Sequence, residues 1–168
     1  MKQTILLLGD PKLYDTSEEV LKEELPQILK VAEDLHDSLI DFRERMGAGR
    51  AIAAPQIDVR KRVIYMYIDK PFTFINPRLE FPDDEMMEVL DDCMSFPHLY
   101  VKVIRHKRCV IHYKNEKWED CRMALEGDLS ELLQHEYDHL DGILATMRAI
   151  DEKAFIMKSY VCPVCQKL

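Results

Sequence analysis

The 168-residue chain has only five glycines and one tryptophan, and it lacks an apolar run near the roughly 20 residues of a membrane-spanning helix. Basic residues are also few: 23 lysines and arginines stand against 31 acidic residues, giving a formal net charge of −8. Because phosphate binding needs a basic face, we expect no direct contact with nucleic acid. The apolar stretch 5–8 is too short for a secretory signal. We therefore expect a cytoplasmic protein, or an organelle-matrix protein if a transit peptide has been removed, without membrane contact.

The length of the chain corresponds to a single domain, and its 47% of apolar residues is too high for a disordered protein. We expect one domain over residues 1–160 and a short tail, 161–168, which contains a Cys-x-x-Cys pair. Five cysteines without a secretory signal indicate thiols or metal ligands rather than disulfides. Cys162 and Cys165 have the spacing of half a zinc knuckle, and a tail without function is the alternative.

Hydrophobic periodicity predicts helices and strands that do not alternate regularly. Apolar residues recur every three or four positions over 18–45, a second helix begins near Asp128, and a third is expected over 151–160. Strand-forming residues gather at 62–68, 72–76, 99–104, 108–113 and 117–124. This order of elements predicts an α+β fold.

The sequence His-Glu-Tyr-Asp-His at 135–139 concentrates the chemistry of the chain. Residues four apart lie on one face of a helix, so His135 and His139 can hold one metal ion together. Glu136 can then reach a metal-bound water as a general base. Such a short motif also arises by chance, as a polar stretch on an exposed helix face. An extended zinc-peptidase motif needs a histidine at position 145, which is alanine, so the third ligand must lie upstream.

Cys93 is the best candidate for this third ligand, because thiolate and imidazole together suit zinc or ferrous iron. The alternative is a buried apolar thiol. A further segment, Gly-Arg-Ala-Ile-Ala-Ala-Pro-Gln at 49–56, combines small residues, which let a backbone approach a ligand, with Gln56. The amide of Gln56 can donate to a developing oxyanion, and a solvated glutamine in a tight loop is the alternative.

These segments, GRAIAAPQ at 49–56, DDCMS at 91–95 and QHEYDH at 134–139, resemble the three motifs of peptide deformylases, in the same order. The resemblance extends to GDPKLY at 9–14, FINPRL at 74–79 and HLDGIL at 139–144, and it covers the chain to about residue 150. It implies mixed or antiparallel strands around a central metal-binding helix, with an N-terminal helix and a short C-terminal helix. It also implies that the chain hydrolyses the N-formyl group of N-formylmethionyl peptides of nascent proteins.

The resemblance also implies a role for individual residues. The metal ligands would be Cys93, His135 and His139, holding one divalent ion, ferrous iron first and zinc as the alternative, with water in the fourth position. Glu136 would accept a proton from this water and pass one to the leaving amine. Gln56 and the Met94 N–H would contact the oxyanion. An extended peptide would pair with the backbone at Ala51, and Arg50 and Leu132 would lie at the pocket for its side chain. An ion pair between Asp138 and Arg105 would stiffen the metal-binding helix. The partner would be a formylated nascent chain, with a transient ribosome contact.

Departures from the family pattern lie near the expected substrate site. Ala51 replaces the second loop glycine, Asp92 replaces a glycine before the cysteine, and Arg50 replaces an apolar residue. These changes leave open three functions: a deformylase, a related amide hydrolase with another substrate preference, and a catalytically silent relative. A zinc peptidase is disfavoured because its downstream ligand is missing.

Two acids raise the question of substrate preference most directly. Asp128 and Glu131 precede His135 by seven and four positions, so they share its helix face with Leu132. Carboxylates in the pocket would disfavour a methionine side chain and favour a polar or basic one. Alternatively, Asp128 is the helix N-cap and Glu131 completes a capping box, which leaves Leu132 and Val89 to form an ordinary apolar pocket.

Overall fold

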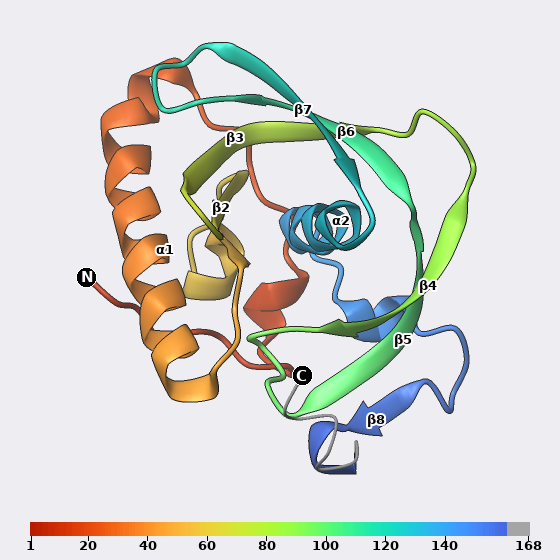
Figure 1. The fold of residues 1–168 in the computed structure, drawn as a ribbon. Helices are drawn as coiled ribbons and strands as arrows, with labels where there is room; N and C mark the ends of the chain where they lie inside the picture. The colour runs from red at the N-terminus through yellow and green to blue at the C-terminus, as the bar shows by residue number, and fades with distance from the viewer. Residues whose placement is uncertain (161–168) are drawn as a thin grey trace.

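Helix α2 (Asp128–Leu140) runs through the middle of the molecule, and the strands curve around it (Figure 1). The structure, a computed structural model, describes residues 1–160. Two sheets are formed, and the pairings between their strands are all antiparallel. The expected α+β arrangement of strands around a central helix is therefore confirmed.

The larger sheet has the strand order β1-β2-β3-β6-β7. Its strands are β1 (Ala51–Ala53), β2 (Val63–Tyr67), β3 (Pro71–Glu80), β6 (Arg108–Lys114) and β7 (Asp120–Glu126). The smaller sheet has the order β4-β5-β8, with strands β4 (Met86–Asp92), β5 (Leu99–His106) and β8 (Phe155–Met157). Strand β1 ends the larger sheet, so one of its edges carries no neighbouring strand. This edge lies in the segment that the sequence marks as the substrate loop.

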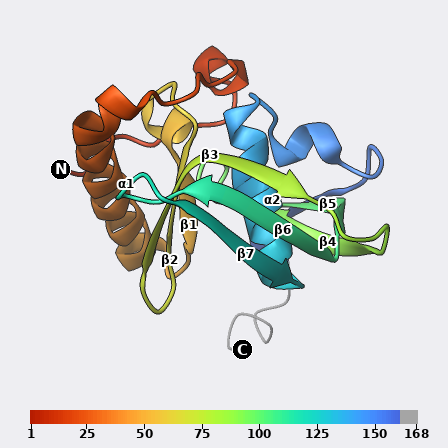
Figure 2. The same ribbon diagram turned by 90° about the horizontal axis from the view of Figure 1, so that it is seen from above.

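Helix α1 (Leu25–Met46) lies beside the β1–β2 end of the larger sheet (Figure 2). Its buried apolar side chains recur at helical spacing and pack against β1 and β2; they are Ile28, Ala32, Leu35, Leu39 and Phe42. The helix begins seven residues later than the predicted start at 18, because Pro26 occupies its first turn and Lys22–Glu24 form a separate 3-10 turn. It ends at Gly47, whose φ of 71° is a left-handed conformation that favours glycine.

The α2 helix buries apolar side chains between the sheets. Leu132, Leu133 and Leu140 pack with Ile64 and Phe74 of the larger sheet in one cluster. A separate cluster around Cys93 joins Val101 and Val103 of β5 to Ala145. Because α2 is enclosed on several sides, polar side chains on it are buried as well, and this enclosure positions the functional site.

Two elements differ from the sequence predictions. The helix expected over 151–160 is wrong for residues 155–157, which form strand β8 against β5; the helical part is the 3-10 turn Lys158–Tyr160. Strand β4 was not anticipated, because six of its seven side chains are exposed or half-buried and only Asp91 is buried. The Cys162–Cys165 pair lies outside the described residues. Within residues 1–160, every helix is too short or too polar to cross a membrane.

Candidate metal centre

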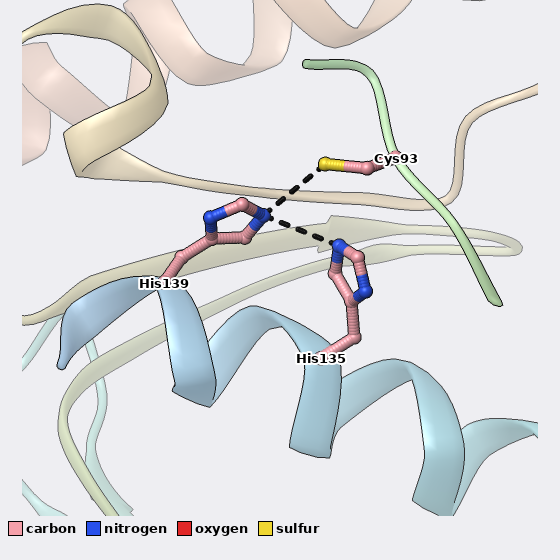
Figure 3. Close-up of side chains that lie close together, drawn as sticks. All are labelled: Cys93, His135 and His139. Atoms are coloured by element: carbon pink, nitrogen blue, oxygen red, sulfur yellow. Dashed lines mark hydrogen bonds between the residues drawn. The ribbon is translucent and has the colours of Figure 1, made fainter. Parts of the chain in front are cut away.

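Cys93, His135 and His139 meet at one point between α2 and the end of β4 (Figure 3). Nε2 of His139 lies 3.2 Å from Cys93 Sγ and 3.2 Å from His135 Nε2. The helix supplies the two imidazoles one turn apart, and the thiol comes from the residue that follows β4. All three side chains are buried, with exposed fractions of 6% or less. The structure thus brings together the three residues that the sequence named as ligands.

The spacing of these three atoms fits one metal ion. Bonds of about 2.0–2.3 Å to nitrogen and sulfur place the corners of a tetrahedron about 3.4 Å apart. The two separations of 3.2 Å are close to this value, and each pair of donor atoms lies within 4.8 Å. A set of two imidazoles and one thiolate suits zinc or ferrous iron. The residues present therefore fit the metal that the sequence motif implies.

Asp91 orients the first histidine for this role. Its Oδ1 lies 2.6 Å from His135 Nδ1, so the imidazole proton belongs on Nδ1 and the lone pair of Nε2 faces the metal position. Burial alone lowers the pKa of His135, but the negative charges of Asp91 and Cys93 outweigh it and raise this pKa well above its usual range. Burial and the charge of His135 lower the pKa of His139. The two imidazoles thus differ: the neighbouring negative charges favour positive charge on His135, whereas burial disfavours it on His139.

A buried ion network supports Asp91 from behind. Arg105, 3% exposed, bonds Asp91 Oδ2 through Nη2 at 2.7 Å and bonds Asp138 through Nη1. Arg148 holds the same Asp138 through two hydrogen bonds of 2.6 and 2.7 Å. The predicted Arg105–Asp138 pair is confirmed, whereas Asp91 and Arg148 were missed by sequence reasoning. The signal for Asp91 was weak, because β4 ends at Asp92 and the inward orientation of Asp91 depends on the pairing of β4 with β5.

Glu136 lies beside the ligands and is 4% exposed. Its Oε2 has no hydrogen-bond partner among residues 1–160. Burial is the main cause that raises the pKa of Glu136 to about 7; His135 opposes this rise and Asp91 adds to it. A buried carboxyl group with a pKa near neutrality is able both to accept and to donate a proton, as a general acid–base group must.

Two further candidate groups lie on the cysteine side. The Gln56 side chain is fixed because its Oε1 accepts a hydrogen bond from the Ala53 N–H at 2.9 Å. Its Nε2 donates to Ser95 Oγ at 3.2 Å and to Cys93 Sγ at 3.4 Å, which points the amide at the metal position. The backbone N–H of Met94 donates to no other residue within the described part of the chain. Ser95 was not singled out from the sequence.

A cavity of about 270 Å³ opens beside the ligands. Its walls include Cys93, His135 and Glu136 together with the three expected substrate positions, Arg50, Ala51 and Leu132. Ala51 belongs to edge strand β1, whose one partner is β2. The cavity therefore joins the candidate metal position to a strand edge with free backbone groups.

The two acids at the start of α2 do not form the expected capping box. Gly127 is the N-cap, and the structure shows no side-chain cap hydrogen bond there. Asp128 instead bonds Arg50, with 2.9 Å between Oδ2 and Nη1. Glu131 lines the cavity. The capping interpretation is therefore wrong, and the interpretation as a polar pocket wall is consistent with these positions.

Two histidines one turn apart on a buried helix, a cysteine from a neighbouring segment and an acid that lines a cavity form a group that could hold one metal ion, as in the metallohydrolase class of enzymes. The chain belongs to the peptide deformylase family, since the family model for polypeptide deformylase matches residues 2–155. Enzymes of this family are metal-dependent hydrolases that act on formylated nascent peptides. The chain is an enzyme of this type, and its predicted activity is confirmed at this level.

Similar proteins cover nearly the whole chain. A peptide deformylase from Treponema pallidum (strain Nichols) is 37% identical over 149 residues, which cover 87% of this chain and 86% of the relative. A peptide deformylase from Pseudothermotoga lettingae is 34% identical over 146 residues, covering 86% and 81%. The crystal structure of peptide deformylase from Thermotoga maritima superposes with a TM-score of 0.82 at 30% identity, covering 90% of this chain and 99% of that one.

Proposed function

We propose that Cys93, His135 and His139 hold one divalent metal ion, and that Glu136 is the proton carrier of formyl-peptide hydrolysis at this centre. The observation that carries the proposal is the convergence of three buried donor atoms within 4.8 Å beside a cavity that Glu136 also lines. Ferrous iron is the proposed native ion and zinc the alternative, because both accept a mixed set of imidazole and thiolate. A silent relative would need the ligands but not Glu136.

A bound ion would supply Lewis acidity, which polarises the formyl oxygen and makes water a stronger acid. Glu136 takes a proton from the attacking water as the carbon–oxygen bond forms at the formyl carbon. It then delivers a proton to the amide nitrogen as the carbon–nitrogen bond breaks, which gives formate and a peptide with a free amine. A pKa of about 7 for Glu136 suits both transfers at neutral pH, because neither direction is strongly uphill.

Gln56 and Met94 are proposed to stabilise the oxygen that becomes negative during the attack. The Gln56 amide is already directed at the metal side of Cys93, 3.4 Å from its sulfur, and it is held there by Ala53. The Met94 N–H donates to no other residue in the range 1–160, so it is free to donate to a ligand. Donors fixed before the reaction cost no reorganisation when the charge develops.

The substrate is proposed to bind as an extended chain along β1. The free edge of this strand offers the backbone groups around Ala51 for antiparallel or parallel addition of a peptide. Arg50 and Leu132 would then flank the first side chain of the substrate. A formylated nascent chain as partner places the reaction in the cytoplasm, or in an organelle matrix, and a transient ribosome contact would accompany it.

The test is formate release from formyl-Met-Ala-Ser by protein that is purified without oxygen and loaded with ferrous iron. We expect turnover by the wild type, and nearly none by Glu136→Ala at an unchanged metal content, because this change keeps all three ligands. A metal-loaded wild type that releases no formate from any formyl peptide contradicts the proposal. So does a Glu136→Ala variant that turns over normally.

A further inference from the structure

Part of the cavity wall beside the candidate metal position is charged. Arg50 and Glu131 line the cavity together with the apolar Leu132, and Arg50 is bonded to Asp128. Their side chains differ in exposure: Asp128 is 78% exposed, Arg50 40% and Glu131 only 13%. Glu131 is thus the least exposed of the three, and it precedes His135 by one helical turn on the same face.

The ion pairs on this wall are unequal. Arg50 donates a hydrogen bond of 2.9 Å to Asp128, so the charges of these two side chains neutralise each other. Its other terminal nitrogen lies 3.6 Å from Glu131 Oε2, which is too long for a hydrogen bond. The Glu131 carboxylate accepts no hydrogen bond from any side chain in the described part of the chain. Burial, which leads, and the charge of Asp91 both raise its pKa, to about 7.

The other charged residues of the cavity leave this imbalance in place. Lys158 and Asp92 form a pair of their own, with 2.5 Å between Nζ and Oδ2. Asp91 is bonded by Arg105, behind the ligands. Besides Glu136, Glu131 is therefore the acid lining the cavity that accepts no hydrogen bond from a described side chain, with Arg50 3.6 Å away, and a ligand that donates to Glu131 supplies that hydrogen bond.

We propose that this wall selects N-formyl substrates whose first side chain ends in a cation, and that Glu131 is the residue that determines this preference. The inference rests on the proposed function, because the wall matters only if the formyl group is bound at the neighbouring metal position. A lysine-like ammonium brings three donors and a charge opposite to that of Glu131. A thioether brings neither, and it covers the carboxylate without pairing it. A volume of about 270 Å³ is below the range for drug-sized ligands and is suited to a single side chain.

The experiment compares substrates that differ only at the end of the first side chain. Iron-loaded wild type is assayed with formyl-Lys-Ala-Ser, with the formyl-norleucine analogue, which lacks the ammonium, and with the methionine and glutamine analogues. We expect kcat/KM for lysine to exceed that for norleucine and methionine by about tenfold or more. Glutamine should fall between them, because it donates hydrogen bonds without a charge.

Two variants assign the effect to Glu131. Glu131→Gln keeps the shape and should reduce the lysine-to-norleucine ratio by about tenfold, and Glu131→Leu should raise the use of norleucine and methionine. Glu126→Gln is the matched control: this glutamate ends β7, is exposed and pairs with Arg108 outside the cavity, so the ratio should not change. Circular dichroism checks that each variant is folded.

Binding is measured separately from turnover. In a Glu136→Ala background, calorimetry with the intact formyl peptides should show the same order of affinities, with lysine tightest. A preference for methionine that Glu131→Gln leaves unchanged overturns the inference but leaves the proposed function standing. Equal use of lysine and glutamine overturns the requirement for a cation. Failure of the metal-loaded wild type to release formate from every peptide contradicts the proposed function itself.

Discussion

The Asp91 side chain links the metal position to the buried ion network, and its replacement by asparagine tests both links at once. One oxygen faces His135 Nδ1 at 2.6 Å and the other faces Arg105 Nη2 at 2.7 Å. Asparagine has one oxygen and one NH₂ group, so it can accept from one of these neighbours only. The other neighbour would meet a donor in a site where Asp91 is fully buried.

The size of the effect follows from what is lost. A hydrogen bond to a charged group contributes about 1.5–3 kcal/mol, and breaking a buried ion pair costs about 3–5 kcal/mol. Because Arg105 keeps Asp138, we expect Asp91→Asn to lower the free energy of unfolding of the metal-free protein by about 3 kcal/mol. For a chain of this length, that corresponds to a fall in Tm of about 6–12 °C. The loss of orientation of His135 should weaken zinc binding by about 10–100-fold.

Asp138→Asn is the matched control. Asp138 bonds Arg105 and Arg148 but makes no ion pair with His135. It should therefore lower stability, yet leave zinc affinity within about threefold of the wild type, a range smaller than that for lost orienting groups. Urea unfolding of metal-free protein measures the first quantity, and competition with a chromogenic zinc chelator measures the second. If Asp91→Asn loses stability but binds zinc as tightly as the wild type, Asp91 does not orient His135.

Three further outcomes are expected. Gln56→Ala should reduce kcat for formyl-peptide hydrolysis by about 10²–10³-fold with little change in metal content; an unchanged kcat would remove Gln56 from the reaction. Gly142→Ala should lower the free energy of unfolding by about 2 kcal/mol or more. The reason is that Gly142 has φ of 70° and that an added Cβ would lie 2.3 Å from the Tyr14 carbonyl oxygen. Normal stability of this variant in thermal unfolding would contradict the prediction. Removal of the metal by a chelator should abolish turnover. It should also lower Tm by about 5–10 °C, relative to protein that is saturated with metal at about 100 times its Kd. Restoring the metal should reverse both effects.

The three side chains that meet at the candidate metal position could be named from the sequence by helical spacing and motif context. Helical periodicity places His135 and His139 on one face, and the motif context singles out Cys93. The partners of these residues were harder to predict, since their roles depend on contacts between distant segments. Asp91 is an ordinary acid until β4 turns it inward, and its ion pair with Arg105 joins two neighbouring strands.

The fold errors have similarly physical causes. Residues 151–160 have apolar residues at helical spacing, but pairing with β5 outweighs this local preference and makes 155–157 a strand. Asp128 and Glu131 have the spacing of a capping box, but Gly127 becomes the N-cap with φ of 63°, and Arg50 on the neighbouring strand segment attracts Asp128 instead. Local rules failed at the positions where a tertiary partner was available.

The acidic residues of α2 form two groups: those that are hydrogen-bonded to arginine and those that line the cavity. Asp128 and Asp138 are each hydrogen-bonded to arginine. Glu131 and Glu136 accept no hydrogen bond from a side chain among residues 1–160, and both line the cavity. A carboxyl group of the cavity wall that accepts no hydrogen bond from the protein can accept one from a molecule that binds in the cavity. For Glu136 this donor is the water and amide of the proposed reaction, and for Glu131 it is the cationic end of the proposed substrate.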